Sequence, residues 1–217
     1  MNRRLQTAAV IAGMLAAAPA VAGDLGVDVP PPAADSPSRA YATFFAGGTR
    51  SSAAAEFWVD GDGFAGVGGE VEDGYIVGAA IGTEVLPHLR GEAEFSVVMI
   101  ELGIIDDDAI DSIGYNLLGN LWYDVDTGTS FTPYVGGGVG WSHNVLTDGV
   151  DEETISGFVY QLGAGVRFAA TENIGFDLGY RYRVLPSAGT SMDLGPDAEL
   201  KVSATTHIVQ GGVTVGF

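Results

Sequence analysis

The stretch 174-IGFDLGYRYRVL-185 alternates between two kinds of side chain at every step. Large apolar residues occupy positions 174, 176, 178, 180, 182 and 184, and glycine or charged residues lie between them. A period of two is the period of a β-strand, because successive side chains point to opposite faces of a sheet. The stretch therefore predicts a strand with one apolar face and one face that carries Asp177, Arg181 and Arg183.

The same alternation recurs from about residue 40 to the end of the chain. It is clear in Phe158 to Phe168 and in Val209 to Phe217. Five further segments follow it less strictly, namely Ile113 to Asp124, Phe131 to His143, Arg90 to Glu101, Gly74 to Glu84 and Tyr41 to Gly48. Short and long connections alternate between the eight strands, and the long ones lie near 49 to 73, 102 to 112, 144 to 157 and 186 to 201. This rhythm predicts an all-β fold, an eight-stranded up-and-down antiparallel barrel.

The apolar face decides whether such a barrel is soluble or spans a membrane. A soluble barrel of the lipocalin or avidin kind carries its apolar residues inside and exposes many Lys and Glu. Here the polar face is crowded with Gly, Ser, Asn and Gln, and the apolar face ends in aromatic residues such as Tyr75, Tyr123, Phe131 and Trp141. This composition favours lipid outside and a packed polar interior, and it predicts a transmembrane β-barrel with aromatic girdles.

Two segments precede the expected barrel domain of residues 40–217. Residues 1–22 start with a basic pair, continue with an Ala-rich apolar run and end in Ala20-Val21-Ala22. They indicate a secretory signal peptide cleaved after Ala22, because the run is too short for a helix to cross a bilayer of about 30 Å. Residues 23–39 are rich in Pro, Asp and Ala, and we expect a flexible periplasmic tail. The predicted location of the mature protein is the outer membrane.

The composition of the chain excludes several classes of protein. The 217 residues include 28 acids and 9 bases, for a formal net charge of -19, so the chain would repel the phosphates of nucleic acid. There is no cysteine, which excludes disulfides, thiol catalysis, Cys-ligated zinc and iron–sulfur clusters. We expect no cofactor.

Four segments carry a resemblance to a known family: 123-YDVDTG-128, 132-TPYVGGGVG-140, 160-YQLGAG-165 and 178-LGYRYR-183. The chain from about 40 to 217 resembles the outer membrane β-barrel family of Gram-negative bacteria, of the opacity/surface-antigen and OmpA/OmpX-like type. The terminal Phe217 resembles the aromatic end of the family's assembly signal, which implies recognition by the barrel assembly machinery. The resemblance implies the fold and leaves the function open, because the family includes adhesins and structural barrels.

Charged residues are concentrated on the predicted inward face. Eight strands leave an interior just wide enough for side chains, and buried charges are tolerated when they are paired and hydrogen-bonded. We therefore expect a mixed charge network that closes the lumen, with a gated ion path as the alternative. The expected members of this network are Arg90, Arg167, Arg181, Arg183, Glu84, Glu92, Glu94 and Asp177.

No catalytic residue and no metal site is predicted. Ser142 and His143 invite comparison with barrel hydrolases that act on lipid A, but adjacent residues of a strand point to opposite faces, which blocks a contact between nucleophile and base. The three His residues are scattered along the chain. The stretch 60-DGDG-63 is similar to the start of a calcium loop, but Phe64 stands where the third ligand is required.

The expected function is that of a non-enzymatic outer-membrane barrel, which supports envelope integrity and presents acidic surface loops of the surface-antigen or adhesion type. A small pore or transporter for small solutes and a lipid A-modifying enzyme are the alternatives. Expected partners are outer-membrane lipid, the barrel assembly machinery and, at the loops, divalent cations or ligands from a host or the environment. The second loop alone contains Asp106, Asp107, Asp108 and Asp111.

Overall fold

The computed structural model describes residues 40–59, 62–105, 108–147, 152–190 and 198–217, and their regular structure is entirely β-strand. The predicted signal peptide (1–22) and tail (23–39) lie outside the described residues. Within the described residues, no helix has the length and hydropathy needed to cross a bilayer. The eight strands are β1 (Tyr41–Val59), β2 (Asp62–Leu86), β3 (Leu89–Ile105), β4 (Asp108–Asp124), β5 (Phe131–Thr147), β6 (Glu152–Ala169), β7 (Ile174–Thr190) and β8 (Ala198–Gly216).

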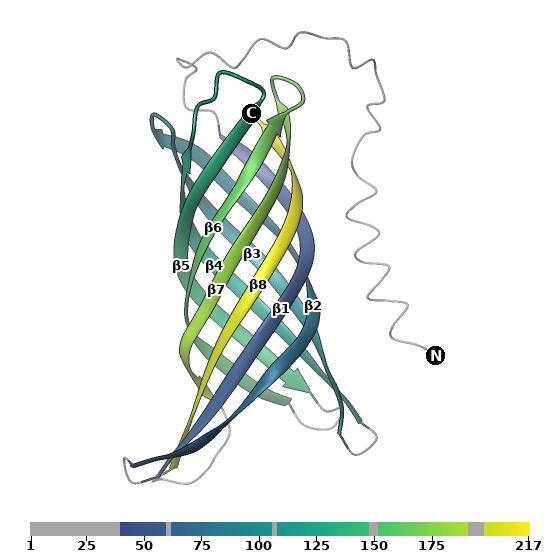
Figure 1. Cartoon of the computed structure of the whole chain (residues 1–217), viewed down its shortest axis with the longest axis vertical. Helices are drawn as coiled ribbons and strands as arrows, with labels where there is room; N and C mark the ends of the chain where they lie inside the picture. Colours follow the sequence, from purple (N-terminus) through teal and green to yellow (C-terminus); the bar gives the residue numbers. More distant parts are fainter. Residues whose placement is uncertain (1–39, 60–61, 106–107, 148–151, 191–197) are drawn as a thin grey trace. The chain divides into compact units, whose positions relative to one another are not determined.

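The strands form a closed barrel in which each strand pairs antiparallel with the next and β1 pairs with β8 (Figure 1). Pro87 and His88 make a two-residue turn between β2 and β3, and His88 adopts a φ of 65° there. The backbone N–H of Phe217 donates to the carbonyl of Ala40 at 2.9 Å, which joins the last residue to the start of β1. The structure thus confirms the predicted eight-stranded up-and-down topology. We call the end that holds these features the short-turn end; in barrels of this architecture it faces the periplasm.

At the opposite end the strands are longer than the sequence pattern predicted. The predicted connection from 49 to 73 is wrong, because β1 continues to Val59 and pairs with β2 as far as Asp62. The other three long connections are shortened by strand in the same way. A strand that has left the membrane needs no apolar outer face, so its alternation fades into runs such as 51-SSAAAE-56.

Three strands extend beyond the rest of the barrel. Pairing between β2 and β3 ends at Gly74 with Ile100, whereas pairing between β1 and β2 continues through Asp62. On the other side of β1, the pairing with β8 reaches Val59 and Ala198. We call these outer parts of β8, β1 and β2 the β8–β1–β2 extension; they run together to the lower end of Figure 1.

The outer surface of the barrel is apolar and the interior is largely polar. Phe44, Leu117 and Leu178 are exposed by about 60% or more on the outside of the barrel, where a membrane would cover them. By contrast, Asn116, Asn120 and Gln161 are buried in the lumen. The outward-facing apolar residues and inward-facing polar residues agree with the predicted transmembrane barrel. Most of the aromatic residues at the strand ends are exposed as well, namely Tyr75, Tyr115, Tyr123, Phe131, Trp141, Phe158 and Phe217.

Candidate functional site

Strand β3 supplies a ladder of inward side chains that changes character along the lumen. Every second residue points inward, so Arg90, Glu92, Glu94 and Ser96 follow one another from the short-turn end. Val98 and Ile100 continue the ladder towards the long-strand end with apolar side chains. The inward side chains of β3 are therefore charged in the short-turn half of the lumen and apolar beyond Ser96.

Glu94 is the centre of the first group of contacts, and its side chain is fully buried. It forms an ion pair and a hydrogen bond with Arg181 Nη1, and it accepts a hydrogen bond from Arg183 Nη2 at 2.9 Å. Amide nitrogens of Asn120 and Gln161 donate to Glu94 Oε2 at 2.8 and 3.1 Å. These five residues come from β3, β4, β6 and β7, so they join strands on different sides of the lumen. We call them the Glu94 cluster.

The Glu94 cluster is bonded internally as well as to its central carboxylate. Gln161 Nε2 donates to Asn120 Oδ1 at 2.8 Å, and Gln161 Oε1 accepts from Arg183 Nη2 at 2.9 Å. Ser96 lies beside the cluster, and its hydroxyl accepts from Arg183 Nη1 at 3.2 Å. A buried carboxylate is stable only when such partners replace its lost hydration. The cluster meets that condition and fills the lumen at this level.

A second group of contacts surrounds Arg90 near the short-turn end. Arg90 donates two hydrogen bonds to the carboxylate of Asp124, from Nε at 2.7 Å and from Nη2 at 2.9 Å. Its Nη1 donates to Glu92 Oε1 at 2.8 Å and to the hydroxyl of Tyr41 at 2.7 Å. Trp122 Nε1 donates to the other oxygen of Glu92 at 2.8 Å. The forked geometry of a guanidinium on a carboxylate is among the strongest polar contacts in proteins. We call these five residues the Arg90 cluster.

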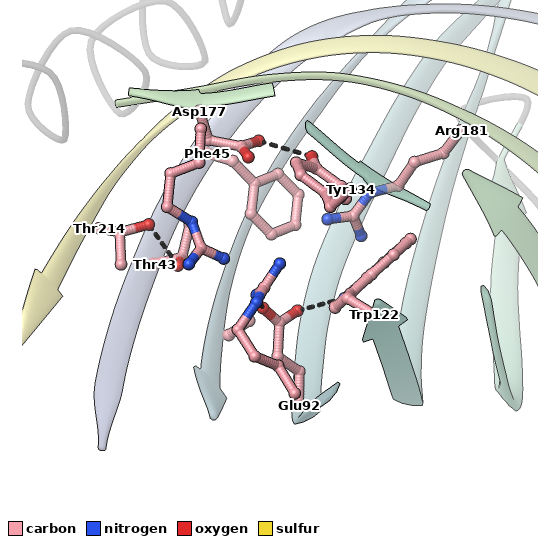
Figure 2. A pocket seen from close by; sticks show the side chains of 11 residues that line it. Thr43, Phe45, Glu92, Trp122, Tyr134, Asp177, Arg181 and Thr214 are labelled. Atoms are coloured by element: carbon pink, nitrogen blue, oxygen red, sulfur yellow. Dashed lines mark hydrogen bonds and ion pairs between the residues drawn. The ribbon is translucent and has the colours of Figure 1, made fainter. Parts of the chain in front are cut away.

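Asp177 and Arg167 line the same small cavity as Arg90, Glu92 and Trp122 of the Arg90 cluster. Figure 2 shows Asp177 close to Tyr134 in this lining. The Tyr134 hydroxyl donates to Asp177 Oδ1 at 3.1 Å, and Arg167 Nη1 is 3.9 Å from Asp124 Oδ2. The cavity that these residues share with Arg181 has a volume of only about 10 Å³. That is space for about one water molecule. The short-turn half of the lumen is therefore closed by side chains.

Aromatic rings fill the gaps between the two clusters. The guanidinium of Arg181 lies 5.0 Å from the ring centre of Trp122 and 5.2 Å from that of Phe45. The guanidinium of Arg90 lies 5.5 Å from the ring centres of both Tyr41 and Tyr134. Such cation–π contacts add to the attraction of the carboxylates.

Glycines in the barrel wall leave space for the aromatic and amide side chains of the lumen. A Cβ atom on Gly165 would lie 2.4 Å from the Tyr134 hydroxyl oxygen, and one on Gly138 would lie 1.9 Å from Asn120 Oδ1. Neither position can carry a larger side chain unless the polar group moves. The glycine-rich strands β5 and β6 thus determine how closely the lumen side chains approach the wall.

Seven of the eight residues predicted for the interior network lie in the lumen, and the structure corrects the assignment of Glu84. Glu84 is exposed, and its Oε1 accepts a hydrogen bond from the backbone N–H of His88 at 3.0 Å. The register of β2 against β3 shifts between Glu84 and Leu86, where the chain turns. Glu84 is still paired with the inward-facing Arg90, and it is exposed because it lies two residues from the end of β2, at the rim of the lumen. The lumen contains Arg90, Arg167, Arg181, Arg183, Glu92, Glu94 and Asp177.

Sequence reasoning missed several partners of these charges. Asp124 was only the last residue of a predicted strand, although it is the main acceptor for Arg90. Tyr41, Trp122 and Tyr134 were missed because aromatic residues suggested the lipid face. Trp122 stands on the polar side of the alternation in Ile113 to Asp124, and this signal could have placed it inside.

The Ser142–His143 pair is separated as the strand period predicted. Ser142 is buried in the lumen and its hydroxyl accepts a hydrogen bond from Asn144 Nδ2 at 3.1 Å. His143 is exposed and its Nδ1 lies 2.7 Å from the hydroxyl of Ser156. In the part of the chain that the structure describes, no three acidic or His side chains gather as a metal site would require. Asp60 and Gly61 of the calcium-loop-like stretch lie outside that part.

A model of a known family matches almost the whole chain, over residues 8–217, and its description is "Outer membrane protein beta-barrel domain". The chain belongs to this family. Its proteins are located in the outer membrane of Gram-negative bacteria, as predicted. The outer membrane protein PagN of Salmonella typhimurium is 36% identical over 74 residues, which cover 29% of this chain and 30% of PagN. The chain thus matches less than a third of that relative's length.

Solved structures share the fold at low sequence identity. Neisserial surface protein A is 17% identical with a TM-score of 0.55, and the match covers 82% of this chain and 97% of that one. The outer membrane protein OprG of Pseudomonas aeruginosa is 16% identical with a TM-score of 0.51, covering 81% and 96% of the two chains. These similarities agree with an outer-membrane β-barrel.

Proposed function

We propose that this protein is a non-enzymatic, non-conducting outer-membrane barrel, which supports the integrity of the envelope and presents its acidic long-strand end to the surroundings. The observation that carries the proposal is the closed lumen. The Glu94 and Arg90 clusters lie one above the other along β3, and both connect strands across the interior.

The geometry of the clusters argues against a pore or transporter for small solutes. A permeating ion would have to displace Glu94 from two arginines and two amides, and then Glu92 and Asp124 from Arg90. Separating one buried, hydrogen-bonded pair costs about 3–5 kcal/mol. The cavity of about 10 Å³ between the clusters offers no wider path. An eight-stranded barrel filled in this way works as a rigid anchor.

The long-strand end is the part available for interactions. Described residues there include Glu56 and Asp73, whose side chains are exposed. Arg50 lies only 3.9 Å from Asp73, so even this base is engaged with an acid. The sequence adds further acids in the connections, and a surface of one sign attracts cations or basic partners and repels polyanions. Presentation of this surface therefore fits a surface-antigen or adhesion role.

Planar-bilayer recording of the purified protein tests the closed lumen. We expect no stable channel of nanosiemens conductance. A double variant, Arg181→Ala with Glu94→Ala, serves as the positive control, because it removes the centre of the Glu94 cluster and should raise the leak current. Stable channels in the unmodified protein would support the transporter instead.

A deletion strain tests the surface role. We expect reduced attachment to host or abiotic surfaces, which returns with the full-length gene and with an Arg181→Ala variant that still assembles. A strain that keeps its attachment but loses uptake of a small solute would contradict the proposal. A changed lipid A with intact attachment would favour an enzyme.

A further inference from the structure

Above the Glu94 cluster, on the side of the long-strand end, the lumen contains a cavity of about 190 Å³. We call it the outer cavity. It lies inside the long-strand half of the barrel, because its lining residues come from the halves of β1 and β3 to β8 nearest that end. Its volume is about twenty times that of the space between the two clusters. The two halves of the lumen therefore differ in what they can hold.

The wall of the outer cavity is mainly apolar. Val98 and Ile100 of β3 face Val159 of β6 and Leu185 of β7 across it, with Ala204 of β8 beside them. Val159 and Leu185 belong to a buried apolar cluster against which Ala204 packs. An apolar cavity of roughly 150 Å³ in a protein can stay free of water and bind a molecule such as benzene. The outer cavity has the size and the wall for an organic molecule of that class.

Arg183 is the one charged residue in the lining of this cavity. Six small polar side chains also line it, those of Ser51, Ser112, Asn116, Ser142, Asn144 and Thr206. A ligand in the cavity would therefore meet an apolar wall along its body and a guanidinium at one end.

The charge of the Glu94 cluster is unbalanced. Arg181 and Arg183 both pair with the single carboxylate of Glu94, which leaves a formal charge of +1 in a buried group. Arg90 has two acid partners, Glu92 and Asp124, so the excess of base in the Glu94 cluster is balanced over the described lumen as a whole. Arg183 is the arginine that lines the outer cavity, and it shares its carboxylate partner with Arg181. A guanidinium in that position favours an anionic group over a neutral one.

We propose that the outer cavity binds a small organic anion, a carboxylate with an aromatic or short aliphatic body. The carboxylate lies against Arg183 and the body packs between Val98, Val159 and Leu185. The volume is enough for a ligand of about the size of benzoate. The inference does not depend on the proposed surface role, since a closed lumen can hold a ligand without passing it through.

Binding is tested with 4-fluorobenzoate and the full protein in lipid nanodiscs, followed by ¹⁹F NMR. Protein-free nanodiscs correct for partition into lipid, and the neutral 4-fluorobenzyl alcohol serves as the matched probe. We expect saturable binding of the anion and at least tenfold weaker binding of the alcohol. Saturable binding of neither probe, or equal binding of both, overturns the proposal.

Two variants locate the site. Arg183→Gln removes the positive charge from the lining of the outer cavity and leaves Arg181 paired with Glu94. This variant should bind benzoate at least tenfold more weakly. Ala204→Trp fills the cavity without touching either cluster and should abolish binding. Val209→Trp, on the lipid-facing side of the same strand, is the control and should bind as the unmodified protein does. If Arg183→Gln does not assemble, Ala204→Trp decides, and undiminished binding by this variant refutes the location.

Discussion

We predict that replacing Glu94 with Gln destabilises the barrel more than any single charge substitution on its surface. The side chain is fully buried and faces two guanidiniums, so the substitution leaves Arg181 and Arg183 without an anion. Gln also replaces one acceptor oxygen by a donor, which would point at an existing donor. Breaking a buried pair by removing one partner costs about 3–5 kcal/mol. The folding equilibrium constant should therefore fall at least about a hundredfold.

Urea unfolding in lipid vesicles, followed by tryptophan fluorescence, measures this loss. Glu56→Gln is the matched control, because it makes the same chemical change at an exposed residue and should leave the unfolding midpoint nearly unchanged. The double variant Glu94→Gln with Arg183→Gln should lose about 1–3 kcal/mol less than the sum of the single losses, because the second change removes one of the unpaired charges. A midpoint for Glu94→Gln equal to that of Glu56→Gln would refute the idea that the cluster supports the barrel.

Three further predictions concern other parts of the molecule. Gly165→Ala should lower the free energy of unfolding by about 1–3 kcal/mol, because the added Cβ would lie 2.4 Å from the Tyr134 hydroxyl oxygen. Gly119→Ala is the control in the same urea assay and should leave the free energy unchanged, because no atom lies within 4 Å of its added Cβ. Deletion of Phe217 should reduce assembly into the outer membrane of cells, seen by fractionation, but not refolding in vitro; equal loss in both would indicate a structural role for this exposed residue. Calcium at millimolar concentration should raise the melting temperature in low salt more than magnesium does, if the acids of the long-strand end bind divalent cations; no shift would leave these acids with a solvating role.

The alternation of residues was sufficient to predict the fold and to place seven of the eight predicted network residues in the lumen. Arg181 and Arg183 alternate with Tyr180 and Tyr182, so once lipid was placed outside, the arginines had to point inward. The partners of each charge did not follow from this pattern. Arg90 pairs with Asp124, which is 34 positions away, because the stagger between strands brings them together. The stagger between neighbouring strands cannot be read from the alternation pattern of a single sequence.

Strand ends were predicted least well, for two different physical reasons. At the short-turn end, Glu84 keeps its register opposite Arg90, but it lies two residues from the end of β2 and is therefore exposed at the rim of the lumen. At the other end, the strands leave the membrane and the contrast between their faces disappears, so Ser52 to Glu56 gave no strand signal although they pair with β8. The alternation of apolar and polar residues reflects the difference between lipid on one face of a strand and the lumen on the other. It ends where both faces of the strand are in contact with water.

The β8–β1–β2 extension has a consequence for self-association. Beyond Gly74, the described part of β2 pairs with β1 alone, so one edge of the strand keeps free backbone donors and acceptors over Asp62 to Asp73. Such an edge is a template for adding a strand from another copy of the chain. This stretch of sequence contains Asp62, Glu70, Glu72 and Asp73 and no base. Two copies that approach edge to edge therefore bring together charges of the same sign, which opposes pairing between the edges of two barrels.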